Sequence, residues 1–154
     1  MAGSIVVAAR QGLVALVQAR PEIETGGPEG GPLQVSYAYP GDDVVEKETI
    51  FTGRSRAEHN PTALKVGRRF RAETATFDVL VQVRLDGDTA ADTEARAFEW
   101  GLEVEEAVAD DYTLGGVVGL NWALVSAWDL NTGLTDIGHL TQLIYTIRYN
   151  ARLT

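Results

Sequence analysis

The pattern of apolar and polar residues divides the chain into two helical and several strand-like segments. Residues 4–20 repeat apolar side chains on one helix face, with Ser4 as a candidate N-cap and Pro21 just past the end. A second helical pattern covers about 89–109, where Thr89 and Asp92 have the spacing of a capping box. We expect this second helix to bury Phe98, Gly101, Leu102, Val104 and Val108 and to turn Glu94, Glu99, Glu103 and Glu106 toward water.

Strand patterns fill the remaining apolar stretches. Residues 33–39 alternate with period two and stop at a Pro-Gly pair, and residues 46–54 do so less regularly. The clearest alternation covers 70–85, followed near the end by two long strands. We expect three sets of core-facing residues: Phe77, Val79, Val81 and Val83; then Val118, Leu120, Trp122, Leu124 and Trp128; and finally Leu143, Tyr145, Ile147, Tyr149 and Ala151.

The order of these segments predicts the fold class. It indicates an α+β fold in which residues 1–154 form a single domain, with a mainly antiparallel β-sheet and two helices packed on one face. The Gly/Pro-rich residues 21–32 are expected to form a flexible loop, and residues 55–69, which lack a sustained apolar period, a long irregular one. The glycines of 26–31 lack the Gly-Lys-Ser/Thr ending of a phosphate loop.

Composition narrows the function classes. The 154 residues contain no cysteine, which excludes a disulfide framework, a thiolate nucleophile and cysteine-ligated zinc. No apolar run is long enough to span a bilayer, so we expect a soluble protein made in the cytoplasm, with no membrane partner. The net charge of −9 argues against affinity for the nucleic-acid backbone.

The charges are segregated along the sequence. Residues 54–71 contain six of the 13 bases and one acid, Glu58, whereas residues 86–111 contain ten of the 22 acids and one base, Arg96. One interpretation is two solvated faces. The other is that the two patches meet between subunits of a head-to-tail ring or on another assembly partner. The candidate interface residues are Arg54, Arg56, Lys65, Arg68, Arg69 and Arg71 on the basic side, and Glu99, Glu103, Glu106, Asp110 and Asp111 on the acidic side.

Catalytic candidates are few. His59 has Ser55 and Glu58 nearby, but neighbours in one irregular loop are not held in the geometry that activates a nucleophile. His139 lies near Asp136 in the last connection, where a solvated turn or a strand cap is the simpler interpretation. The chain lacks paired histidines at metal-binding spacing. We therefore predict no catalytic residue, no metal and no cofactor.

Two adjacent glycines separate the second helix from the following strand. Gly115 and Gly116 lack the lysine, the hydroxyl and the following helix of a phosphate loop. A positive φ costs little only at glycine, so we predict that they form a structural hinge that stops the helix and reverses the chain into the sheet.

These elements together carry a family resemblance. A first amphipathic helix, a basic irregular loop before the central strand, an alanine-rich second helix ending in "DDYTLGG" and two closing strands resemble the tail terminator proteins of long-tailed bacteriophages, which also occur in gene transfer agents. The most specific part is the run from Asp111 to Gly116. The glycines of 26–31 have no counterpart that we can assign in that family.

The resemblance implies a structural role. Such subunits form a hexameric ring on the head-proximal end of the tail tube, stop its polymerisation and offer a surface to the head connector or stopper protein. The implied location is the tail or neck of the virion, assembled in the host cytoplasm, with genome DNA passing through the lumen without specific binding. The alternatives are another head-tail connector or tail completion protein, or a small hydrolase or ligand-binding domain using His59 and the basic loop as an anion site.

Overall fold

The chain folds as one five-stranded sheet with helices on one side. The computed structural model describes residues 3–27, 30–65, 68–85, 89–136 and 138–153, and their side chains except those of 60–70. The elements are α1 (Val6–Gln18), α2 (Pro21–Thr25), β1 (Gln34–Ser36), β2 (Glu48–Lys65), β3 (Arg68–Leu85), α3 (Ala90–Asp110), β4 (Leu120–Thr135) and β5 (Gly138–Leu153). The strand order is β1-β2-β3-β5-β4; only the β1–β2 pair is parallel. The predicted α+β class is confirmed, with three helices rather than two in the described residues.

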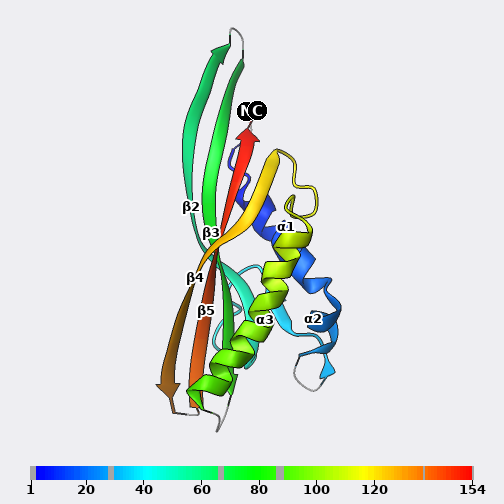
Figure 1. The fold of residues 1–154 in the computed structure, drawn as a ribbon, viewed down its shortest axis with the longest axis vertical. Coiled ribbons are helices and arrows are strands. Elements are labelled where there is room, and N and C mark those ends of the chain that lie inside the picture. Colours follow the sequence, from blue (N-terminus) through cyan, green and yellow to red (C-terminus); the bar gives the residue numbers. More distant parts are fainter. Residues whose placement is uncertain (1–2, 28–29, 66–67, 86–88, 137, 154) are drawn as a thin grey trace.

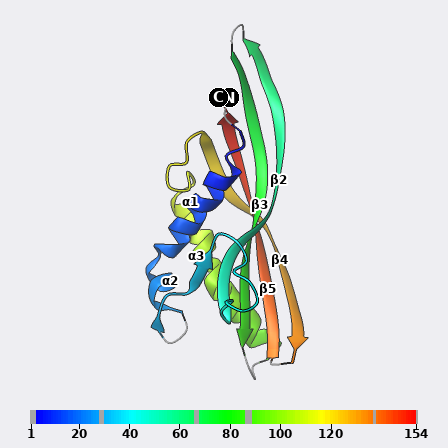
Figure 2. The ribbon, with the colours of Figure 1, turned by 180° about the vertical axis from the view of Figure 1, so that it is seen from behind.

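The core lies between the sheet and the two long helices. Figures 1 and 2 show α1 and α3 on the same face of the sheet, leaving the other face open. The predicted inward residues of β3 and β5 are all buried, including Phe77 and Tyr149, whose rings lie 6.3 Å apart. Gly101 lets α3 approach β5 closely, because a Cβ at this position would stand 2.3 Å from the Tyr145 hydroxyl. Glycine here serves close packing rather than backbone flexibility.

The prediction of an irregular loop at 55–69 is wrong. Residues 48–65 and 68–85 form two long paired strands whose register runs to Lys65 opposite Arg68. Figures 1 and 2 show this hairpin extending past the end of β5, and Leu153 is the last β5 residue paired with β3. Residues 54–59 are all exposed. Because neither face of this segment is buried, the strand needs no apolar alternation, and periodicity could not reveal it. Pro61 is accommodated beside a register shift between Pro61 and Leu64.

Several element boundaries also differ from expectation. Residues 21–25 form the short helix α2, begun by Pro21 and anchored by the buried Ile23, so only the rest of the expected loop at 21–32 is irregular where it is described. The strand at 33–39 shrinks to Gln34–Ser36. Helix α1 has Ile5 rather than Ser4 as N-cap, and the Ser4 hydroxyl donates to Glu73 while it accepts from the Val6 N–H at 3.2 Å. The Thr89 cap of α3 is confirmed: its side chain accepts from the Asp92 N–H at 3.3 Å.

The predicted inward face of β4 is wrong. Register shifts between Leu120 and Trp122 and between Val125 and Ala127 each insert a residue, so the alternation reverses along the strand. Leu120 and Trp128 lie beside buried β5 residues, whereas Trp122 and Leu124 pair with Asn150 and Arg148 on the open face. The exposed fractions of Trp122, Leu124 and Trp128 are 36%, 43% and 54%, and that of Val118, before the strand, is 90%.

Candidate functional site

The basic segment covers the hairpin end of β2 and β3, and only its part beyond Pro61 and Arg71 projects past the end of β5. Arg54 and Arg56 are exposed on β2, and Arg71 is half-buried on β3. The strand register brings Lys65, Arg68 and Arg69 to the far end of the hairpin, since Lys65 pairs with Arg68 and Leu64 with Arg69. The six bases therefore lie on one hairpin rather than on an irregular loop, and Lys65, Arg68 and Arg69 belong to the part that projects past β5.

The acidic residues of α3 have cations within the same chain. Arg20 contacts Glu103 at 2.5 Å, Glu106 at 2.6 Å and Asp110 at 3.3 Å. These acids raise the pKa of the Arg20 guanidinium, first through the hydrogen bond to Glu103, although burial acts in the opposite direction. Glu103 is buried, contrary to its predicted place in water, whereas Leu102, predicted to be buried, is 49% exposed.

A second arginine binds the beginning of the same helix to the sheet. Arg96 contacts Glu48 of β2 at 2.5 Å and Glu99 at 2.8 Å, and its guanidinium lies 4.5 Å from the centroid of the Trp100 ring. Neither arginine cluster could be predicted from the sequence, because no local pattern indicates that Arg20 contacts a residue more than 80 positions away on α3. The proposed inter-subunit role of Glu99, Glu103, Glu106 and Asp110 stays a prediction, but all four have an intrachain partner.

The segment after α3 is held by its own side chains. Asp111 accepts hydrogen bonds from the Thr113 N–H at 2.9 Å and from the Gly115 N–H at 3.0 Å. Hydrogen bonding, first from the Thr113 hydroxyl, lowers the pKa of the Asp111 carboxyl. Gly115 and Gly116 have φ of 83° and 80°, and they lie in the turns between α3 and β4. The helix itself ends earlier, at Asp110.

A buried polar cluster is centred on Glu73 of β3, which is fully buried. Its carboxylate accepts from the Tyr149 hydroxyl at 2.5 Å, the Ser4 hydroxyl at 2.9 Å and the Ile5 N–H at 3.3 Å, and it lies 2.7 Å from His59 Nε2. Burial alone would raise the pKa of this carboxyl, but the hydrogen bonds, first that from Tyr149, bring the pKa below its ordinary value. One carboxylate thus joins α1, β2, β3 and β5.

The predicted position of His59 in an irregular loop is wrong. The residue belongs to β2 rather than to a mobile loop, and it faces Glu73 directly across the hairpin. In a catalytic triad the imidazole lies between the carboxylate and the nucleophile. Here the carboxylate lies between Ser4 and His59, an order that does not aim the imidazole at the hydroxyl. The geometry is that of a structural cluster joining elements. The other histidine, His139, lies in β5 opposite Leu134, near the exposed Asp136.

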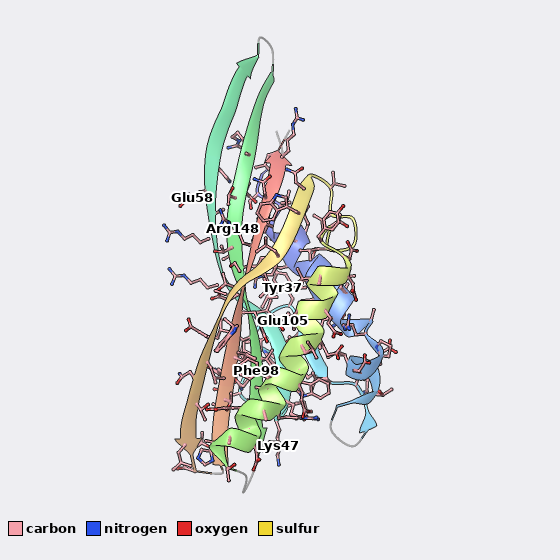
Figure 3. The ribbon with its side chains drawn as sticks, viewed as in Figure 1. Tyr37, Lys47, Glu58, Phe98, Glu105 and Arg148 are labelled. Carbon is pink, nitrogen blue, oxygen red and sulfur yellow. The ribbon has the colours of Figure 1, made fainter. Side chains whose placement is uncertain are left out.

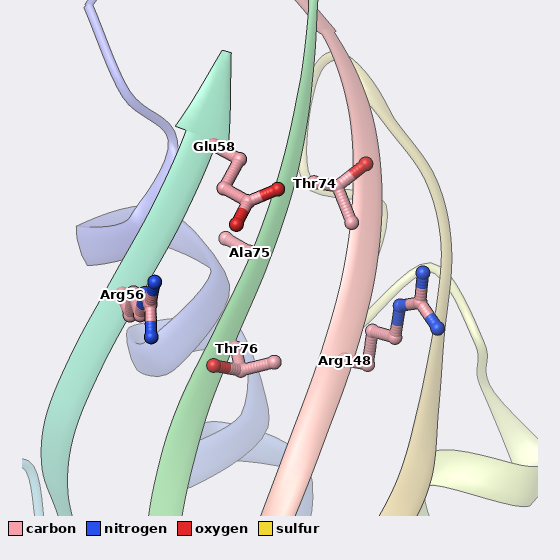
Figure 4. Close-up of a pocket in the computed structure, with 6 residues that line it drawn as sticks. All are labelled: Arg56, Glu58, Thr74, Ala75, Thr76 and Arg148. Atoms are coloured by element: carbon pink, nitrogen blue, oxygen red, sulfur yellow. The ribbon is translucent and has the colours of Figure 1, made fainter. Parts of the chain in front are cut away.

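The open face of the sheet carries a shallow hollow. Its volume is about 290 Å³, and Arg56, Glu58, Thr74, Ala75, Thr76 and Arg148 line it. Figure 4 shows these residues on three neighbouring strands, with the two guanidinium groups on opposite sides. In Figure 3, Glu58 and Arg148 of this face lie apart from Phe98 and Glu105 on α3. The hollow could receive a small anion, although Glu58 opposes a negative charge.

The described parts of the chain contain neither a metal-binding cluster nor a membrane-spanning helix. Among these residues, no group of three or more His, Asp or Glu side chains has an arrangement that could hold a metal ion. Within the same residues no helix combines the length and apolar character needed to cross a bilayer.

Comparison with known proteins does not identify the chain. No protein-family model matches it, and no curated protein has a significantly similar sequence.

Proposed function

We propose that the chain is a structural virion protein that forms a hexameric ring at the head-proximal end of a phage-type tail tube. In this role it terminates tail polymerisation and provides the head-tail joining surface. The observation that carries the proposal is the projecting β2–β3 hairpin, whose 54–71 segment concentrates six bases away from the acidic helix α3. A subunit with one basic and one acidic surface is suited to a heterologous contact, in which two different surfaces meet. Such a contact forms a ring when the rotation between successive subunits closes.

Two further observations support this role. The sequence resembles tail terminators in element order and in the segment from Asp111 to Gly116. The net charge of −9 suits a protein through which DNA slides without adhering, because acidic surfaces repel the phosphate backbone. The expected partners are other copies of the chain, the tube protein and a head connector or stopper protein.

The test is a tail-assembly experiment with the purified chain. We expect the chain to run as a ring-sized oligomer in size-exclusion chromatography with light scattering, and to stop elongation when added to growing tubes. A monomer at high concentration that neither binds tubes nor shortens them would overturn the proposal. A ring that binds the head connector but leaves tube length unchanged would favour another head-tail joining or completion protein.

A small anion-binding domain is the second candidate, and the hollow between Arg56 and Arg148 favours it. Arg148 is exposed on β5, so Arg148→Ala should leave folding intact. Calorimetric titration with inorganic phosphate distinguishes the tail role from the anion-binding function. Saturable binding that Arg148→Ala abolishes, in a chain that does not assemble, supports the anion-binding function; absence of heat opposes it.

A further inference from the structure

Strand β4 is an outer strand with an edge open to another chain. Its 16 residues include one charged side chain, Asp129, and neither proline nor lysine. Outer strands of soluble proteins usually carry lysine, proline or inward charges, because free N–H and C=O groups otherwise pair with another strand. The Tyr112 carbonyl accepts the Ala123 N–H at 2.9 Å, so the loop before β4 covers the start of this edge. The part from Leu124 to Thr135 remains for strand addition.

Large apolar side chains accompany this edge. Trp128 is 54% exposed although its ring packs against Phe98 at 5.2 Å between centroids, and Leu134 is 78% exposed. Leu102, one helical turn beyond Phe98 on α3, is 49% exposed. Apolar surface next to an unpaired strand is typical of a protein–protein contact, because burial there removes both from water.

The opposite edge of the sheet offers a matching strand. Strand β1 pairs only with Thr49, Ile50 and Phe51 of β2, so β2 is an outer strand from there toward the hairpin end in the described residues. Residues 54–59 are exposed without alternation. Both β2 and β5 are antiparallel to β3, and β4 is antiparallel to β5, so β4 runs antiparallel to β2. Within one subunit, Ser55 is level with Val125 and His59 with Leu120. A second copy in the same orientation, shifted along the strands so that its residues 54–59 lie beside the free part of β4, would therefore present β2 to β4 as an antiparallel partner.

The charges of the two edges are complementary. The β4 side has Asp129 within the strand and Glu94 of α3, which accepts from the Thr132 hydroxyl at 2.8 Å, and β4 has no base. The β2 side has the exposed Arg54 and Arg56. Opposite charges favour the β4–β2 contact over contacts between two β2 edges, where bases would meet bases.

We propose that the β4 edge, from Leu124 to Thr135, binds the exposed edge of β2 around residues 54–59 of a second copy as an antiparallel strand. The sheet then continues from one subunit into the next, and Trp128 is covered by the neighbour's hairpin. This assignment rests on the ring proposed above, and it names the two surfaces that build it.

The absence of cysteine from the sequence allows a direct cross-linking test. Ala57→Cys on β2 is combined in one full-length chain with Ser126→Cys, Asn131→Cys or Gly133→Cys on β4, all exposed positions. Because β2 and β4 are three strand spacings apart, about 14 Å, no disulfide can form within one subunit. After mild oxidation we expect at least one pair to give a ladder of linked dimers, trimers and larger species on non-reducing gels.

Control cysteine variants distinguish the β4–β2 contact from other contacts. Ala57→Cys with Glu24→Cys, on exposed α2, should give no ladder. A single β4 cysteine that forms dimers efficiently would indicate a two-fold β4–β4 contact and overturn the assignment. An oligomer in which no β2–β4 pair links, or a chain that stays monomeric, overturns it also. A ladder in a chain that fails to stop tube growth refutes the proposed tail role while leaving the β4–β2 contact in place.

Discussion

Removing the Tyr149 hydroxyl tests whether the Glu73 cluster stabilises the fold. In Tyr149→Phe the buried carboxylate loses one of its hydrogen bonds, the 2.5 Å contact, while the ring and its packing remain. A hydrogen bond to a charged group contributes about 1.5–3 kcal/mol, so we expect the free energy of unfolding to fall by about that amount. Glu73→Ala, which also leaves the hydroxyl buried without its acceptor and creates a cavity, should cost about 3–5 kcal/mol.

The assay is urea denaturation followed by tryptophan fluorescence at one fixed protein concentration, because self-association adds to apparent stability. Tyr112→Phe is the matched control, since Tyr112 is 58% exposed, and it should change the free energy by less than about 0.5 kcal/mol. If Tyr149→Phe is as mild as that control, the hydrogen bond contributes nothing and the argument for the cluster fails.

The same cluster predicts a pH dependence. The pKa of the Glu73 carboxyl is lowered in the folded protein, so its contribution is complete above the ordinary glutamate value of about 4.3 and is lost as pH falls through the folded pKa. Glu73→Gln cannot titrate, so it should flatten the loss of stability in this acid range. An equally steep loss in wild type and Glu73→Gln would show that other carboxyl groups cause it.

Three further predictions concern packing, the acid cluster and assembly. Gly101→Ala places a Cβ 2.3 Å from a buried tyrosine hydroxyl and should destabilise the fold by about 1–3 kcal/mol in the same denaturation assay, although alanine is the better helix former. Arg20→Gln removes the cation that contacts the buried Glu103 and should lower the free energy of unfolding by about 1–3 kcal/mol. If the difference between wild type and Arg20→Gln becomes smaller when the salt concentration is raised, the ion pair is screened. Trp128→Lys should shift the oligomer toward monomer in light scattering, whereas Val118→Lys, at an exposed position outside the strand, should not.

The sequence predicted those strands that have one buried face and one exposed face. Alternation revealed β3 and β5 because Phe77, Ile147 and their neighbours face helices while the residues between them face water. The same criterion failed for the 54–59 part of β2, which is exposed on both faces, and for β4, where two inserted residues shift Trp122 to the open face. Both segments are strands because their backbones pair with neighbouring strands, and this pairing leaves no regular side-chain pattern in the sequence.

The candidate site could be predicted even less completely, because its contacts join distant segments. Local spacing placed His59 beside Ser55 and Glu58, yet the hairpin register puts it opposite Glu73. The acidic residues are concentrated between residues 86 and 111 by their count along the sequence. Their cation, Arg20, could not be identified, because a helix–helix contact decides which arginine reaches them.

The arginine contacts change what assembly can use as its driving force. Arg20 and Arg96 already contact four acids of α3, so these charges are less available to a neighbour than a count along the sequence indicates. Exposed ion pairs contribute little and are screened by salt, whereas strand pairing and the burial of an aromatic side chain are not. The proposed ring should therefore depend more on the β4 edge and Trp128 than on attraction between the basic hairpin and the acidic helix. Moderate salt should loosen it only slightly, and the charged hairpin would mainly select which edge of the neighbour it meets.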